Sequence, residues 1–215
     1  RTMCNDGIWG SACVSKAKVA IISTGDELIP PGQELQPSQL YESNSFGLAG
    51  LVKWLGHQPK RFNAVSDTID ELRDALDKAA QSCDVILTSG GVSMGDWDLV
   101  RKIMQEEGDL KFWRVKLRPG SPPLFGMWKG TPIFGLPGNP VSSHVVFRMI
   151  VAPWLRHSTS ATGPIETKVR VKLADKVKST EDCMTLRRIQ IHSTEKGLIG
   201  TQPRHQGSGN LESLA

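Results

Sequence analysis

The sequence predicts an α/β protein with a mostly parallel sheet, followed by a small β domain. Short β-branched runs end in glycine and acidic residues, and helical repeats separate them, so strand and helix alternate three times before Gly108. Alternation of this kind favours a parallel sheet with right-handed crossovers. Beyond Pro164 the apolar residues recur with period two and no helical repeat is present, which is typical of β structure.

Length and composition exclude several classes of protein. A chain of 215 residues can hold one large domain, or one domain and a smaller one. The net charge of +4 comes from mixed signs without basic runs, so no nucleic-acid partner is expected. No stretch approaches the roughly 18 apolar residues that a membrane helix needs, so no membrane partner is expected. Four scattered cysteines indicate free thiols in a cytoplasmic protein: Cys4, Cys13, Cys83 and Cys183.

Both ends of the chain are interpreted as cut ends of a longer protein. Residues 1–17 have no periodic signal and are read as the tail of a missing upstream region. We place an α/β domain at 18–156, a linker rich in Ser, Thr and Gly after it, and an incomplete C-terminal β domain at 164–215.

The first strand is predicted over Lys18–Ser23, whose nearly continuous β-branched run is typical of a strand covered on both faces. It leads directly into Thr24, Gly25, Asp26 and Glu27. Open α/β sheets gather ligands at this position, although an ordinary surface turn is the alternative. A helix then begins near Asn44 and ends at Gly56, with its apolar residues at Phe46, Leu48, Leu51, Val52 and Leu55.

A weaker strand is predicted over Gln58–Val65, and it ends at Asp67. Thr68 and Glu71 match a capping box, which predicts that a helix begins there. The helix is supported by apolar residues three and four positions apart: Ile69, Leu72, Leu76, Ala79 and Cys83.

The next predicted strand is followed by a glycine-rich loop. The strand contains Val85, Ile86 and Leu87. Gly90, Gly91 and Gly95 allow a ligand to approach the backbone, and Asp98 stands where a helix should start. Strand, glycine loop, helix start and acid outline a phosphate and metal site. A tight turn with Asp98 as a helix cap is the alternative. Three acids follow corresponding strand ends, which favours a site: Glu27, Asp67 and Asp98.

Two further loops contain residues suited to anions. A strand over Leu110–Leu117 gives way to Arg118, whose guanidinium can donate two parallel hydrogen bonds to an oxyanion. A strand over Thr131–Leu136 leads to a proline-rich loop and a helix starting at Pro140, whose N–H groups would attract a phosphate-like anion. The alternatives are an exposed arginine beside a structural turn, and a loop that is structural alone.

Strands are predicted in the C-terminal part over Lys168–Val177, Met184–His192 and Leu198–Gln202. Arg187 and Arg188 occupy adjacent positions. Because adjacent residues of a strand face opposite sides, we expect only one of the two arginines to address a shared site.

Three motifs occur in a fixed order: S-T-G-D-E-L at 23–28, S-G-G-V-S-M-G-D-W-D at 89–98 and G-L-P-G-N-P-V-S at 135–142. Together they resemble the molybdopterin molybdenumtransferase family, which includes bacterial MoeA and the E domains of gephyrin and its plant counterpart. The resemblance runs from about Lys18 to Ala215. It implies a three-layer α/β/α molybdopterin-binding domain and a β-barrel-like domain after it. It also implies that magnesium-assisted insertion of molybdate into adenylylated molybdopterin releases AMP, in a homodimer whose shared cleft includes domains upstream of this chain.

The resemblance assigns site residues in this chain. The catalytic positions are Glu27, Asp67, Asp98 and Arg118, and Asp67 and Asp98 are the magnesium ligands. The substrate-binding positions are Thr24, Gly25, Asp26, Ser89, Gly90, Gly91, Ser93, Gly95, Asp96, Pro119, Gly120, Ser121, Pro122, Pro137, Gly138, Asn139, Pro140, Ser142, Arg188 and Ser208.

The chain departs from the family at one loop, where the family writes K-P-G-K-P and residues 118–122 read R-P-G-S-P. Arg118 can replace the first lysine as an anion donor, whereas Ser121 lacks the charge of the second. A non-catalytic module that binds pterin or nucleotide is therefore an open alternative. A scaffold role like that of gephyrin is a third possible function. An adenylyltransferase of the same fold fits less well, because those proteins lack the β domain after Pro164.

Overall fold

The computed structural model describes residues 16–92, 98–160, 166–195 and 197–203. Its centre is a six-stranded sheet in the order β4-β1-β5-β9-β8-β6. The first four strands of this order are parallel, and β8 runs antiparallel between β9 and β6. The strands are β1 (Lys18–Ser23), β4 (Gln58–Arg61), β5 (Val85–Ser89), β6 (Asp109–Trp113), β8 (Leu124–Trp128) and β9 (Thr131–Leu136). The predicted α/β fold with a mostly parallel sheet is confirmed.

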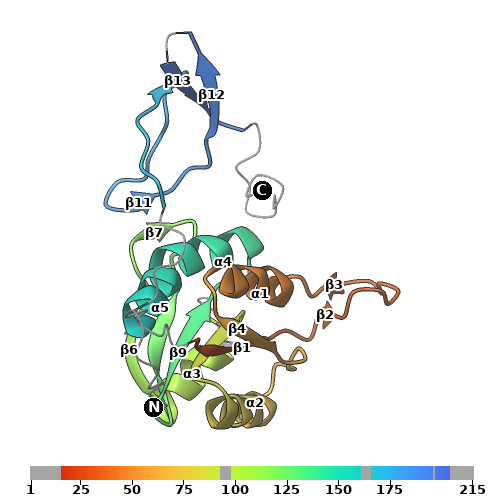
Figure 1. Cartoon of the computed structure of the whole chain (residues 1–215). Coiled ribbons are helices and arrows are strands. Elements are labelled where there is room, and N and C mark those ends of the chain that lie inside the picture. The colour runs from red at the N-terminus through yellow and green to blue at the C-terminus, as the bar shows by residue number, and fades with distance from the viewer. Residues whose placement is uncertain (1–15, 93–97, 161–165, 196, 204–215) are drawn as a thin grey trace, which may run out of the picture.

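Helices cover both faces of this sheet, as Figure 1 shows with α1, α4 and α5 above it and α2 below. The alternation of side chains explains the two faces: in β1, Val19 and Ile21 enter one apolar core, and Ala20 and Ile22 enter the other. The first core is covered by α1 (Asn44–Trp54), α4 (Pro140–Val146), the π-helical turn η1 (Phe147–Val151) and α5 (Ala152–Thr159). The second is covered by α2 (Ile69–Ser82) and α3 (Leu99–Glu106). The expected three layers are therefore present.

Several expected elements differ from the structure in detail. The strand expected over 58–65 ends earlier, at Arg61. Helix α2 begins as predicted, but the capping box is wrong, because the Thr68 side chain makes no capping hydrogen bond. Glu71 instead accepts a hydrogen bond of 2.5 Å from the Ser66 hydroxyl.

The strand predicted over Leu110–Leu117 is two strands, β6 and β7 (Leu117–Arg118). The chain breaks at Arg114, whose φ of 70° is left-handed and does not continue a strand. Strand β8 was not predicted. A β-carbon at its Gly126 would lie 2.6 Å from the Asp109 carbonyl oxygen, so the glycine that weakens the strand pattern is required by the contact with β6.

The C-terminal strands lie beyond one end of the α/β layers (Figure 1). Within the described residues, β10 (Lys172–Leu173), β13 (Gly197–Thr201) and β12 (Gln190–Thr194) form an open three-stranded sheet with mostly exposed side chains. The predicted barrel is therefore not confirmed. One further strand, β11 (Met184–Thr185), pairs with β7 and ties this part of the chain to the α/β layers.

A short parallel pair, β2 (Leu28–Ile29) and β3 (Leu40–Tyr41), completes the described strands. None of the helices in the described part of the chain is long and apolar enough to cross a membrane.

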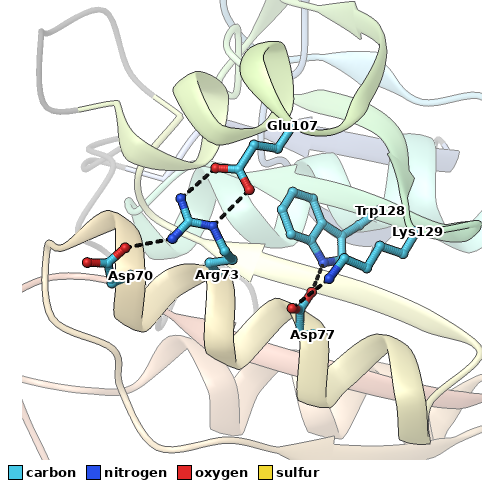
Figure 2. A network of polar contacts seen from close by, with 6 residues as sticks. All are labelled: Asp70, Arg73, Asp77, Glu107, Trp128 and Lys129. Carbon is cyan, nitrogen blue, oxygen red and sulfur yellow. Dashed lines mark hydrogen bonds and ion pairs between the residues drawn. The ribbon is translucent and has the colours of Figure 1, made fainter.

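A polar network on the outer face of α2 joins it to α3 and to the turn between β8 and β9 (Figure 2). Arg73 donates to Glu107 of the α3 end and, at 2.6 Å, to Asp70. Asp77 accepts a hydrogen bond of 2.8 Å from the Trp128 indole N–H and one of 2.7 Å from the Lys129 ammonium. Since Trp128 is 1% exposed, Asp77 supplies the acceptor that its buried indole N–H requires.

We predict that Asp77→Ala lowers the free energy of unfolding by about 1–3 kcal/mol, because it leaves a buried donor unpaired. Urea unfolding at neutral pH measures this change. Asp74→Ala is the matched control, since Asp74 lies exposed on the same helix. Equal losses in the two variants would contradict the role given to Asp77.

The same carboxylate makes stability depend on pH. Hydrogen bonding to Lys129 and to the Trp128 indole holds the pKa of Asp77 below its usual value. A lowered folded-state pKa means that the stabilisation is complete above the unfolded pKa of about 4 and is lost as the pH falls through the folded value. Asp77→Asn should remove this part of the acid destabilisation.

Candidate functional site

Three loops meet at one edge of the sheet because β1, β5 and β9 are parallel neighbours. They enclose a cavity of about 420 Å³, which we call the acidic cavity. Its lining residues are Thr24, Gly25, Glu27, Leu28, Asn44, Asp67, Ser89, Gly90, Gly91, Val92, Pro122, Pro137, Gly138 and Asn139. The structure therefore brings together most of the predicted residues from the strand ends.

The loop after β5 lies against the loop after β1. A β-carbon at Gly90 would lie 2.7 Å from the Thr24 carbonyl oxygen, and the Gly90 φ of 99° is left-handed. The Thr24 N–H also donates to the Ser89 carbonyl at 3.0 Å. Only glycine fits this combination of conformation and space, which explains the glycine pair after the strand.

The loop after β9 is held by its own polar side chains. Ser143, which is fully buried, donates its hydroxyl to the Pro137 carbonyl. Asn139 caps α4, with its side-chain oxygen accepting from the Ser142 N–H at 3.1 Å. The Ser142 N–H therefore has a partner within the chain, and the anion expected at this helix start stays a prediction.

Two carboxylates line the acidic cavity, and a third lies beside it. Glu27 and Asp67 line it, and the Asp67 N–H donates to Asp26 at 2.9 Å. Burial, and then the charges of Asp26 and Glu27, raise the pKa of Asp67 above its usual value. A raised pKa shows that a negative charge here is poorly compensated, so the group fits a hard cation such as Mg²⁺.

Asp98, the second predicted magnesium ligand, lies at the start of α3, is 5% exposed and does not line the acidic cavity. The described residues contain no group of three or more His, Cys, Asp or Glu side chains arranged to hold a metal. Magnesium usually keeps several waters and one or two carboxylates, with substrate phosphate completing its shell. The donor set therefore fits a cation that arrives with a phosphorylated substrate.

A second cavity of about 530 Å³ lies between the α/β layers and the C-terminal segment. We call it the arginine cavity, because Arg118, Arg187 and Arg188 line it. Arg118 donates to the Thr180 hydroxyl at 3.4 Å, and Arg187 donates to the Lys178 carbonyl at 2.8 Å. Neither Arg118 nor Arg187 forms an ion pair within the described part of the chain. The remaining lining residues are Pro119, Val141, Val145, Thr180, Thr185 and Leu186.

These two cavities divide the predicted residues of the turn 118–122 between them. The Arg118 turn contributes Arg118 and Pro119 to the arginine cavity but Pro122 to the acidic cavity. Between them, Gly120 packs against Val146 and Ser121 donates to the Val115 carbonyl at 3.3 Å. The cavities are thus neighbours that share this turn as a wall.

The remaining predicted residues fall into two groups. Asp26, Gly120, Ser121, Pro140 and Ser142 are described and line neither cavity. Four predicted residues lie outside the described residues: Ser93, Gly95, Asp96 and Ser208.

The sequence reasoning missed two residues that the structure places in the cavities. Arg187 was set aside in favour of Arg188, but residues 186–189 are not a strand, so both arginines line the same cavity. Asn44 was read as a helix start only, yet its side chain donates at 2.7 Å to both Ser89 and Gly138 of the acidic cavity. The sequence did contain one sign of this role: Asn44 is a polar side chain directly before the apolar repeat of the helix.

Comparison with known proteins places the chain in a family. The family model described as "Probable molybdopterin binding domain" matches residues 20–157. The chain therefore belongs to the molybdopterin-binding domain family. Within this family it groups with the MoeA-type proteins, as the following relatives show.

The chain is similar to the molybdopterin molybdenumtransferase of Haemophilus influenzae, with 36% identity over 147 residues, or 68% of this chain and 36% of the relative. It is 40% identical over 145 residues to that of Nostoc, covering 66% of this chain and 33% of the relative. The crystal structure of the molybdopterin biosynthesis MoeA protein from Pyrococcus horikoshii matches with a TM-score of 0.71 at 31% identity, over 93% of this chain and 46% of that one. The chain thus spans about a third to a half of these proteins.

We predict that Gly90→Ala lowers the free energy of unfolding by about 2 kcal/mol, because alanine is strained at this φ and meets the Thr24 carbonyl. Chemical unfolding measures the change. Gly50→Ala is the control, since a β-carbon at Gly50 of α1 would meet nothing within 4 Å. An unchanged stability in Gly90→Ala would show that the loop relaxes away from β1.

Proposed function

We propose that this chain forms part of a transferase that inserts molybdate into adenylylated molybdopterin and releases AMP. One observation carries the proposal: an acidic cavity and an arginine cavity share a wall at the turn 118–122. Two neighbouring cavities of opposite charge suit a reaction that brings a cation-neutralised phosphate and an oxyanion together. The family membership and the MoeA-type relatives support the same reaction.

In this proposal the acidic cavity receives the adenylate end of the substrate with Mg²⁺. Asp67, which lines this cavity, is the proposed magnesium ligand there, and Asp98 stays a predicted ligand that lies outside the lining. The ion would neutralise the charge of the phosphate. Glu27 adds a third carboxylate to the same edge of the sheet. Gly90 and Gly138 keep the walls thin enough for the backbone to approach the ligand.

The arginine cavity is the proposed place of molybdate. Arg118 and Arg188 are its predicted donors, and Arg187 supplies a third charge that offsets the neutral Ser121. A guanidinium donates parallel hydrogen bonds to an oxyanion, each charge-assisted bond contributing on the order of 1.5–3 kcal/mol. Ser208 stays a predicted contact outside the described residues. The mechanism is electrostatic positioning and needs no nucleophilic side chain.

We also propose that the chain consists of two domains, at 18–156 and 164–215. It would belong to a longer protein that is cytoplasmic and forms a homodimer. The two cysteines of the described residues, Cys83 and Cys183, are free thiols, in keeping with a reducing compartment. The competing function is a module that binds the ligand without chemistry. Ser121 favours that alternative, since its hydroxyl donates to Val115 and it lines neither cavity.

We expect Asp67→Asn to lower molybdate-dependent AMP release about 100-fold in a full-length homodimer, because it removes a carboxylate that holds the cation. Released AMP is quantified after mixing with adenylylated molybdopterin, Mg²⁺ and molybdate. Asp74→Asn, an exposed aspartate of α2, is the control and should keep full release. Substrate binding without AMP release in the wild type would favour the non-catalytic module instead.

We expect Arg187→Gln to weaken molybdate binding about tenfold, since one charge-assisted donor is lost from the arginine cavity. Calorimetric titration of the chain with sodium molybdate measures the affinity. Arg170→Gln, an exposed arginine outside the cavity, serves as the matched control. If the two variants bind molybdate equally well, Arg187 has no part in the anion site.

A further inference from the structure

We infer that Asn44 is a positioning residue that holds two walls of the acidic cavity together. Its amide nitrogen donates at 2.7 Å to the Ser89 hydroxyl oxygen at the end of β5, and at 2.7 Å to the Gly138 carbonyl in the loop after β9. The Gly138 carbonyl can only accept, so the nitrogen of the amide must face it. One side chain from α1 thus adds a link between two loops that follow the paired ends of β5 and β9.

Asn44 is itself fixed on the side of β1. Glu42, which is 6% exposed, accepts from the Ser23 hydroxyl at 2.8 Å and from the Ser45 N–H at 2.7 Å. Its other oxygen accepts from the Ser45 hydroxyl at 2.6 Å. These bonds attach the first turn of α1 to the last residue of β1, so the backbone that carries Asn44 does not move freely.

Asn44 is also fixed on the side of α4. One turn further along α1, a β-carbon at Gly47 would lie 2.5 Å from the His144 imidazole. Helix α1 therefore packs closely on α4, the helix that follows the Gly138 loop. Anchored to β1 and α4, Asn44 can act as a spacer of defined length between their loops.

The spacer affects what the cavity presents to a ligand. The two walls touch, since a β-carbon at Gly138 would lie 3.5 Å from the Gly90 Cα. Asn44 also occupies the Gly138 carbonyl, an acceptor that would otherwise repel a phosphate in a cavity already lined by Glu27 and Asp67. The positioned wall thus favours a phosphorylated ligand; this choice of ligand rests on the proposed function, whereas the spacer rests on the geometry.

The test compares Asn44→Ala and Asn44→Asp with Asn63→Asp, an exposed asparagine given the same charge change. Calorimetric titration with AMP and Mg²⁺ should give an affinity at least about tenfold weaker in both Asn44 variants and unchanged in the control. The Gly90 N–H donates to the Leu136 carbonyl at the end of β9, and the Ser142 N–H donates to Asn139 of the loop after β9. Amide hydrogen exchange followed by NMR should accelerate at Gly90 and Ser142 and stay slow in β1. A loss of structure throughout would instead accelerate all of them.

The outcomes separate the spacer from the proposed function. If wild type binds AMP and both Asn44 variants bind and exchange as wild type does, the inference is wrong. If wild type does not bind AMP, the proposed substrate is wrong, and the exchange at Gly90 and Ser142 still decides the role of Asn44. Faster exchange confined to those loops supports the spacer; unchanged exchange overturns it.

Discussion

The contact between the β5 loop and the β1 loop at Gly90 is the constraint on which the acidic cavity depends. Parallel neighbours bring three loops to one edge of a sheet, but side chains would ordinarily hold those loops apart. Here a left-handed glycine passes so close to the Thr24 carbonyl that no β-carbon fits. The loops therefore meet backbone to backbone, and the carboxylates of Glu27 and Asp67 line the cavity beside this contact.

The separation of charge between the two cavities follows from the turn that divides them. An arginine inside the acidic cavity would pair with its carboxylates and neutralise both partners. Instead, Gly120 packs on Val146 and closes the wall, and the guanidinium of Arg118 lies on the other side. The arginines of one cavity and the carboxylates of the other can then lie near each other without forming ion pairs.

How much the sequence predicted depended on the range of the interactions involved. The strands 18–23 and 131–136 and the acids after parallel strands were predictable, because they follow from local runs and from topology. Arg187 and the arginine cavity were not, since β11 joins β7 across more than sixty residues and the segment after it is not a strand. The role of Asn44 was not predicted for a related reason: its hydrogen-bond partners Ser89 and Gly138 lie far from it in the sequence.

The crowded carboxylates of the acidic cavity destabilise the folded chain when Asp67 is charged. Burial and the neighbouring charges of Asp26 and Glu27 raise the pKa of Asp67, so the folded chain holds its proton more tightly than the unfolded chain does. A raised carboxylate pKa means that stability falls as the pH rises through that value. Such crowding destabilises the folded chain, and it becomes favourable when a cation binds, because the same charges then attract the cation. The residues that weaken the fold are therefore those that prepare it for a ligand.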